Sequence, residues 1–338
     1  MSSRLRWPLL ALAGLLALNL VLAPEFFSVR LQDGHLYGSL VDILKNGAPT
    51  LLVALGMTLV IATRGVDLSV GAVAAIAGAL ACTHIAGSAD PGGPAAALGG
   101  MALALGLCLL LGLWNGFLVA VLGIQPIIAT LVLMTAGRGL AMLLTEGQII
   151  TVDNSAYRLV GAGYLVLPVA ILISGAALLA VTLLTRRTAL GLLIESVGVN
   201  PAASRLAGIR SRRIIWTCYA FAALCAGVAG LMISSNVSAA DANNAGLWIE
   251  MDAILAVVIG GTALTGGRYS LAGTLLGALL IQTLTTTIYT IGIAPEITLV
   301  FKAIVVIGIC LAQAPKARAL LRRRPPRARA EPEKVVTP

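Results

Sequence analysis

The feature that most constrains this chain is a series of long apolar runs separated by short polar stretches. A helix needs about 20 apolar residues to cross the hydrocarbon core of a membrane, where its backbone groups must be bonded internally. Ten runs approach this length, at residues 8–23, 47–63, 67–86, 95–120, 125–145, 164–184, 214–234, 250–264, 270–290 and 296–313. The sequence therefore predicts an all-α polytopic membrane protein with about ten transmembrane helices.

Composition supports a membrane protein and limits the kinds of partner that we expect. Only 11% of the residues are charged and 59% are hydrophobic, whereas about a quarter of an average soluble domain is charged. Aromatic residues make up 4% and the net charge of +9 gathers at the predicted membrane edges, so we expect contact with membrane lipid and not with nucleic acid. All five cysteines lie inside apolar runs, which predicts no disulfide and no metal site.

The basic residues also indicate the orientation. If the N-terminus is cytoplasmic, 18 of the 23 lysines and arginines fall on the cytoplasmic side and three on the outer side, as the positive-inside rule expects. An even number of spans then places both termini in the cytoplasm. The first run also resembles a signal peptide, but Pro24 directly after the apparent cleavage site disfavours cleavage, so we interpret it as the first membrane helix.

The chain divides into a transmembrane domain at 1–313 and a basic tail at 314–338, expected to be disordered against lipid headgroups. The run at 250–264 is short for a full crossing, and almost no loop separates the second run from the third. Short or broken helices are therefore expected. Asp67 and Ser69, at this inner turn, are candidates to cap the helix that follows.

One long polar segment, Thr185–Arg213, interrupts the apolar pattern on the cytoplasmic side. Leucine, isoleucine and valine recur in it at helical spacing, which predicts a short amphipathic helix. Gly198 and the Asn200-Pro201 pair end this helix and begin another. A soluble motor protein could dock on such a helix; the alternative is a helix that lies on the bilayer surface.

Polar residues inside or beside the spans are candidates to line a pathway, since they are costly in a membrane. The first group is Asn115, Gln125, Thr130 and Arg138; the alternative is that they bond within the bundle. The second, expected on the outer side, is Asp241, Asn243, Asn244, Trp248, Glu250 and Asp252. Amides and carboxylates beside an aromatic ring suit a polyhydroxylated ligand, although a solvated loop would have the same composition.

No pattern in the sequence indicates an enzyme. No Gly-Lys pair is present, so the phosphate-binding loop of nucleotide hydrolases is absent, and we assign no catalytic residue and no cofactor to the chain. No pair of carboxylates is expected in the middle of the membrane, which argues against an ion-coupled carrier. These features leave either a passive channel or a pathway protein whose energy comes from another subunit.

Four stretches carry a specific resemblance: GVDLSVGAV at 65–73, WNGFLVAVLGIQPIIATLVLMTAGRG at 114–139, ALGLLIESVGVNPAASRLAGI at 189–209 and MDAILAVVIGGTALTGGRYSLAGTLLGALLIQ at 251–282. They resemble the permease subunits of bacterial ABC sugar importers of the ribose/galactose type. Within that family, QDGHLYGSLVDILKNGAP at 32–49 and ADANNAGLWIEMDAILAVVIGG at 240–261 are similar to galactofuranose permeases. The resemblance implies a permease bundle in the bacterial inner membrane that translocates a monosaccharide.

The resemblance also implies partners. A periplasmic sugar-binding protein would deliver the sugar, a cytoplasmic ATPase would use the ATP, and a second permease chain would complete the pathway, with a homologous heterodimer favoured over a homodimer. The ATPase would dock on the coupling residues Leu190, Gly191, Ile194, Glu195, Gly198, Asn200, Ala203 and Gly208. One departure is visible, because Arg64 stands where the family usually has the first of two glycines.

Alternatives remain at this point. The cargo of such an importer could be galactofuranose or a sugar like ribose or xylose. A stand-alone secondary carrier or channel for a small polar solute is a different class, and the long cytoplasmic segment argues against it. A lipid exporter subunit is a third, which the acidic and amide-rich outer group does not favour.

Overall fold

The structure is a computed structural model that describes residues 5–22, 24–28, 30–32, 35–292, 297, 299–304 and 307–308. The predicted tail at 314–338 lies outside the described residues, and so does about half of the last predicted run. The described part of that run is helical.

Most of the described chain is helical. Short strands form two antiparallel pairs, β1 (Arg30–Gln32) with β2 (His35–Tyr37) and β3 (Ile150–Thr151) with β4 (Ala239–Ala240), and a 3-10 turn covers Pro24–Phe27. The helices are α1 (Arg6–Leu22), α2 (Ser39–Ala62), α3 (Val70–Ala86), α4 (Pro94–Ala120), α5 (Pro126–Leu144), α6 (Ser155–Gly161), α7 (Val169–Arg187), α8 (Leu190–Val199), α9 (Pro201–Leu206), α10 (Ser211–Val237), α11 (Ile249–Ile259) and α12 (Leu271–Thr290).

Six helices of the described part are long and apolar enough to cross a membrane: α2, α4, α5, α7, α10 and α12. The expected count of about ten is therefore not confirmed. Helices α1 and α3 have 17 residues each and α11 has 11. The prediction that residues 250–264 form a short helix agrees with α11.

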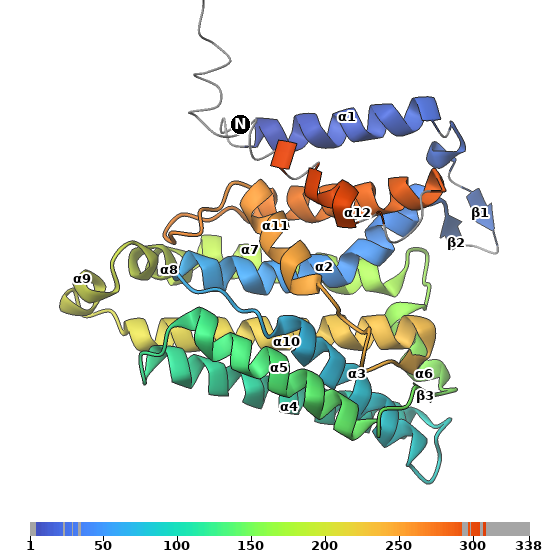
Figure 1. Cartoon of the computed structure of the whole chain (residues 1–338), viewed down its shortest axis with the longest axis horizontal. Coiled ribbons are helices and arrows are strands. Elements are labelled where there is room, and N and C mark those ends of the chain that lie inside the picture. Colours follow the sequence, from blue (N-terminus) through green and yellow to red (C-terminus); the bar gives the residue numbers. More distant parts are fainter. Residues whose placement is uncertain are drawn as a thin grey trace, which may run out of the picture.

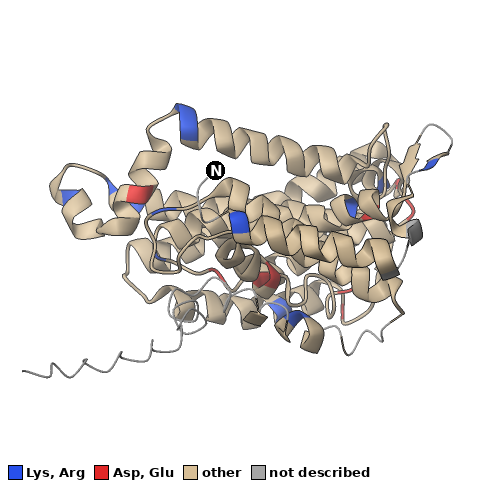
Figure 2. Cartoon of the chain, turned by 90° about the horizontal axis from the view of Figure 1, so that it is seen from above, with Lys and Arg blue, Asp and Glu red and all other residues tan. Residues whose placement is uncertain are grey.

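The long helices lie side by side along the longest dimension of the molecule (Figure 1). Helix α10 is central and packs against α2, α3 and α4, while α12 packs against α2, α11 and α1. Helices α8 and α9 lie together at one end, which we call the α8 end, and α6 with the strands lies at the other, the α6 end. Charged residues gather at these two ends, and few lie along the helices between them (Figure 2).

Two helices begin inside the bundle. After α2 finishes at the α8 end, residues 63–69 run inward before α3 starts and continues toward the α6 end (Figure 1). Residues 241–248 run inward from the α6 end, and α11 then continues toward the α8 end. Broken helices are tolerated in membranes only where protein or a cavity covers the freed backbone groups, so these two starts are the places to examine for function.

Small residues allow the helices to approach closely. A Cβ atom at Gly230 of α10 would collide with the carbonyl oxygen of Ala74 in α3, and one at Gly277 of α12 would collide with that of Ala256 in α11. Close backbone approach of this kind drives helix association in lipid, where apolar surface by itself gives no preference.

The first prediction concerns this packing. Gly230→Val should destabilise the protein by about 1–3 kcal/mol because the inserted side chain has no room beside Ala74. The matched control is Gly106→Val, since a Cβ at Gly106 meets no atom within 4 Å. Thermal unfolding in detergent should show a lower midpoint for the first variant only; equal midpoints would contradict the packing described.

Candidate functional site

The start of α3 is surrounded by buried polar side chains. The backbone N–H and the hydroxyl of Ser69 donate to Asp67 Oδ1 at 3.0 and 2.6 Å, and the Asn115 amide donates to Ser69 Oγ at 2.9 Å. All three residues are about 1% exposed. Thr130 Oγ1 reaches the carbonyl oxygen of Val66 at 3.4 Å. Residues predicted separately as an inner turn and as pathway candidates thus meet at one place.

Neither of the two expected residues caps α3 with its side chain. Ser69 precedes the first residue of α3, but its side chain does not bond the free N–H groups of the helix. The Asp67 carboxylate instead accepts from the Ser69 backbone, and so fixes the turn that leads into the helix.

The segment before α11 is held by its own acidic residue. Asp241 accepts hydrogen bonds from the backbone N–H groups of Asn243 and Asn244 at 3.0 and 3.2 Å, and from the Asn244 side-chain amide at 2.7 Å. These bonds, the side-chain amide first, lower the pKa of Asp241. Trp248 has a positive φ of 64° just before α11, and its side chain is 48% exposed. Asn243, Asn244 and Trp248 therefore form an accessible polar and aromatic surface.

Arg138 of α5 fastens this segment to the bundle. Its Nη1 donates to the carbonyl oxygens of Ala242 and Ala245 at 2.9 and 2.7 Å. Its charge is attracted to Glu250 and Asp241. Two carbonyl groups that the broken helix leaves free are thereby satisfied. The contacts thus show the alternative given for Arg138, which was a bond within the bundle. A role for Arg138 in the pathway stays a prediction.

The structure corrects the expected position of Glu250. This residue does not lie in an outer loop: it is 3% exposed, and its carboxylate is so close to Gly71 that a Cβ there would collide with it. With Asp67, it gives two buried carboxylates beside the first turn of α3. The expectation that no pair of carboxylates lies in the middle of the membrane stays a prediction.

Two further candidates are not part of this group. Asp252 forms an ion pair with Lys302, with 2.9 Å between Oδ2 and Nζ. Gln125 is exposed just before α5. Their assignment to a pathway stays a prediction.

Sequence reasoning missed Tyr219. This α10 residue is fully buried, and a Cβ at Gly65 would collide with its hydroxyl. Among the described residues, its hydroxyl and the Asn115 side-chain oxygen are buried without a hydrogen-bond partner. No pattern marks Tyr219 because it lies within an apolar run. Unpaired buried groups are costly, and both of these lie near the turn that leads into α3.

Helix α8 has one side packed on the bundle and one side free. Ile194, Val197 and Gly198 are buried, whereas the apolar side chains of Leu192 and, on α9, Leu206 are 69% and 92% exposed. Of the predicted coupling residues, Gly191, Ile194 and Gly198 are buried, Leu190 and Glu195 are half-buried, and Asn200, Ala203 and Gly208 are exposed.

The loop between these helices is capped as expected. Asn200 Oδ1 accepts from the N–H groups of Ala202 and Ala203 at 3.0 and 3.1 Å, and this begins α9. Leu192 and Leu206 were not predicted, although the spacing of Leu192 places it opposite the buried side chains of α8.

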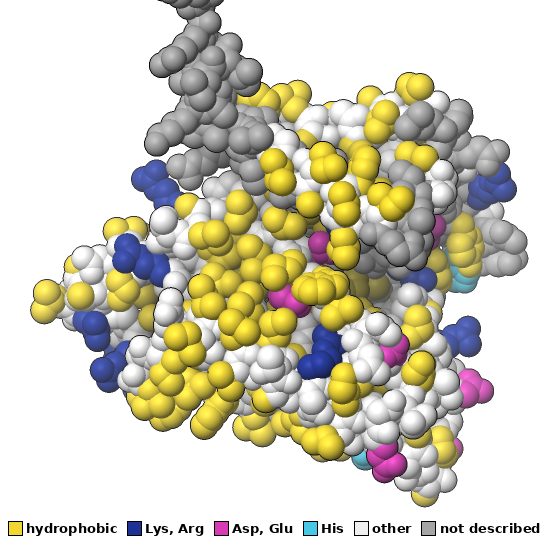
Figure 3. Space-filling model, viewed as in Figure 1, with side chains coloured by type: hydrophobic (Ala, Val, Ile, Leu, Met, Phe, Trp, Pro, Cys, Tyr) yellow, Lys and Arg dark blue, Asp and Glu magenta, His cyan; other side chains and the backbone are white. Residues whose placement is uncertain are grey.

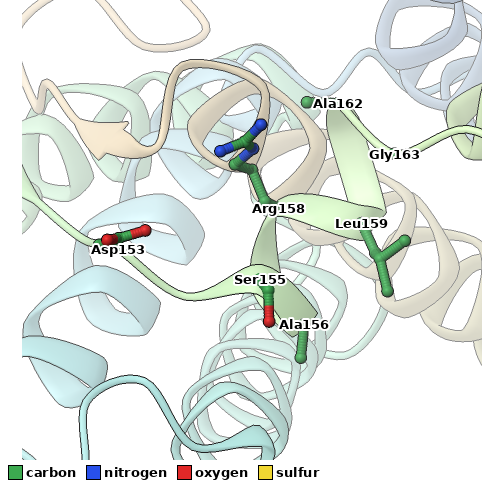
Figure 4. A pocket seen from close by; sticks show the side chains of 7 residues that line it. All are labelled: Asp153, Ser155, Ala156, Arg158, Leu159, Ala162 and Gly163. Atoms are coloured by element: carbon green, nitrogen blue, oxygen red, sulfur yellow. The ribbon is translucent and has the colours of Figure 1, made fainter.

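At the α6 end, an open hollow of about 540 Å³ lies beside α6. Asp153 and Arg158 extend their charged groups at different sides of it (Figure 4). Among the described residues, no group of three potential ligands could hold a metal ion.

Comparisons with known proteins agree with a transport role. A family model described as the permease component of a branched-chain amino acid transport system matches residues 39–310. The chain is 48% identical to a galactofuranose transporter permease of Escherichia coli, over 94% of each chain. It is 39% identical to a fructose import permease of Bifidobacterium longum, over 95% of this chain and 90% of that one. It is 36% identical to a ribose import permease of Escherichia coli, over 88% and 90%. No solved structure gave a significant match.

A bundle of apolar helices interrupted at buried polar residues defines a multi-pass membrane transport protein. The matched residues and relatives show that the chain belongs to the permease-component family that includes these sugar import permeases, which are inner-membrane transport subunits and not enzymes.

The second prediction tests the anchoring role of Arg138. Arg138→Met removes the donor to Ala242 and Ala245, and a hydrogen bond to a charged group is worth about 1.5–3 kcal/mol. Hydrogen exchange of residues 241–248 should become faster by on the order of tenfold or more. Arg158→Met, at an exposed residue of α6, is the control and should leave that exchange unchanged. Unaltered exchange in both variants would show that the segment is held by other contacts.

Proposed function

We propose that this chain is the membrane-spanning subunit of a bacterial ABC importer and that its cargo is galactofuranose. The observation that carries the proposal is the 48% identity to a galactofuranose permease over 94% of both chains. The exposed Asn243, Asn244 and Trp248 support it, because fixed amide groups and an indole ring suit a compound with many hydroxyl groups. The fructose and ribose permeases among the relatives make those sugars the competing cargoes.

A separate ATPase drives transport in this proposal, and it docks at the α8 end. Leu192 and Leu206 support this location because exposed leucines at a polar, basic end of the molecule suit a protein partner. The exposed Asn200, Ala203 and Gly208 lie on the same short helices and loops. Glycine and isoleucine residues on the buried side of α8 hold the docking helix in place.

The α8 end is then cytoplasmic, and so are both termini. The α6 end faces the periplasm, where a sugar-binding protein delivers the cargo near the hollow beside α6. The basic residues of α7 to α10 support this orientation, since the positive-inside rule places such clusters in the cytoplasm.

A second, homologous permease chain completes the pathway. Its support is the broad apolar surface seen in Figure 3, with a few acidic and basic side chains inside it. Exposed residues of α5 and α11, among them Val132, Thr135 and Met251, belong to the part of the bundle near Arg138 and Trp248. A pathway between two such chains would be lined by both apolar and polar side chains, as this surface is.

An ion-coupled carrier is the second candidate, because Asp67 and Glu250 are buried carboxylates near a helix break. Buried acidic groups of that kind can carry protons or bind sodium ions. The two functions differ in their source of energy, which an experiment can separate.

The third prediction tests docking. Leu206→Asp should lower the amount of ATPase that copurifies with the tagged permease by on the order of tenfold, because it places a charge in an apolar contact. Leu165→Asp is the control, since Leu165 is also exposed, at 64%, but lies at the α6 end. Equal recovery of the ATPase with both variants would place the docking surface elsewhere.

The fourth prediction tests energy source and cargo. In vesicles that contain the copurified complex and are supplied with the sugar-binding protein, uptake of labelled galactose, which includes a furanose form, should require ATP and persist when ion gradients are collapsed. Trp248→Ala should reduce this uptake without reducing ATPase copurification. Uptake that follows an ion gradient without ATP would favour the carrier, and preferred uptake of ribose or fructose would change the cargo.

A further inference from the structure

A cleft lies between α7 and α10 at the α8 end, and we call it the α7–α10 cleft. Both helices pack against α2, and α8 packs against all three. The cleft has a volume of about 140 Å³. Leu184 of α7 and Thr217 of α10 line it and are exposed, so the cleft opens to the surface between these two helices.

The walls of the cleft are apolar. Leu59 of α2, Ile194 of α8 and Phe221 of α10 line it. The hydroxyl groups of Thr185 and Thr217 also belong to its lining, but each donates to a carbonyl oxygen of its own helix, at 2.7 and 2.9 Å. An apolar cavity of about 150 Å³ with walls of this kind stays dry and binds a benzene-sized apolar group. A hydrocarbon segment is therefore the occupant that these walls suit.

Two arginines stand at the end of the cleft. On α10, Arg213 precedes Thr217 by four residues, and on α7, Arg187 follows Leu184 by three. Residues three or four apart share a side of a helix, so each arginine lies on the side of a cleft residue, one turn nearer the α8 end. Both arginines are exposed, and neither takes part in an ion pair within the described part of the chain. Their charges are available to an anion.

An apolar cleft beside two unpaired cations matches a phospholipid with a negative headgroup. Basic pockets between membrane helices bind such headgroups on the cytoplasmic side, which is where the proposed orientation places the α8 end. Guanidinium groups are also well matched to phosphate oxygens. A free phosphate ion would leave the apolar cleft unfilled, and a lipid without net charge would gain less from the arginines.

We propose that the α7–α10 cleft binds one acyl chain of an anionic phospholipid, and that Arg187 and Arg213 bind its phosphate. Leu190 and Ile194 of α8 line the cleft, so the bound chain supports this helix from its buried side. The inference goes beyond the proposed function and does not depend on the cargo or on the ATPase.

The experiment measures which lipid the purified full chain retains, together with any subunits that copurify. The protein is extracted in mild detergent, supplied with equal amounts of phosphatidylglycerol and phosphatidylethanolamine, washed, and examined by native mass spectrometry. The first variant, Arg187→Gln with Arg213→Gln, removes the two cations. Its control, Arg205→Gln with Arg268→Gln, removes the same charge from exposed residues elsewhere at the α8 end.

The second variant, Thr217→Trp, fills the opening of the cleft with an indole ring. Thr217 is exposed and its hydroxyl bonds only within α10, so the change breaks no contact between helices. The control is Thr290→Trp, because Thr290 is also exposed and its hydroxyl bonds within α12, outside the cleft. Thermal unfolding in detergent confirms that both variants are folded.

The unaltered chain should retain phosphatidylglycerol in preference to phosphatidylethanolamine. The double arginine variant should retain less phosphatidylglycerol by about tenfold or more, Thr217→Trp should retain less of both lipids, and the two controls should equal the unaltered chain. Equal retention of the two lipids by the unaltered chain, or of neither, would overturn the proposal; in the second case the cleft is empty or covered by protein. Unchanged phosphatidylglycerol in the arginine variant would also overturn it, and so would equal losses in the variants and their controls.

Discussion

The rest of this structure depends on how backbone groups are satisfied where two helices break inside an apolar bundle. Water is scarce there, so each free N–H or carbonyl needs a protein partner. Arg138 supplies one set of bonds to the carbonyl groups of Ala242 and Ala245, and Asp67 accepts from the backbone of Ser69. The polar residues of the site are therefore needed, in the first place, to stabilise the backbone where the two helices break.

The same breaks concentrate charge. Helices α3 and α11 begin inside the bundle and run toward opposite ends (Figure 1). The start of a helix carries a partial positive charge, and the buried carboxylates Asp67 and Glu250 lie near these starts. Half-helices with opposed directions are a recurrent way to build a polar site at mid-depth in a transporter. In this chain, exposed Trp248 and Asn244 lie on the segment that leads directly into buried Glu250.

Sequence alone predicted the features that depend on local order along the chain, such as the extent of a helix and which of its sides is apolar. Apolar periodicity and length predicted most of the helices, the short α11 and the amphipathic α8. The cost of a polar group in the membrane predicted a bond within the bundle for Arg138 only as an alternative to a role in the pathway. The sequence did not predict how deeply a residue is buried in the bundle, because tertiary contacts decide where a broken helix begins. Glu250 was therefore placed outside although it is buried against Gly71, and Tyr219 gave no signal within its apolar run. Exposure of Leu206 likewise depends on which side of α9 the bundle covers.

The packing of α8 limits how movement can enter the bundle. Ile194 and Val197 are buried, and Gly198 touches the backbone of Ala62, so α8 cannot slide along α2 without a clash. Close-packed interiors transmit strain instead of absorbing it. The end of α8, the end of α2 and the 266–267 turn are therefore joined as one closely packed unit. Because that unit continues through Arg64 into the turn before α3, the end of α8 is joined by continuous packing and hydrogen bonds to the buried polar group.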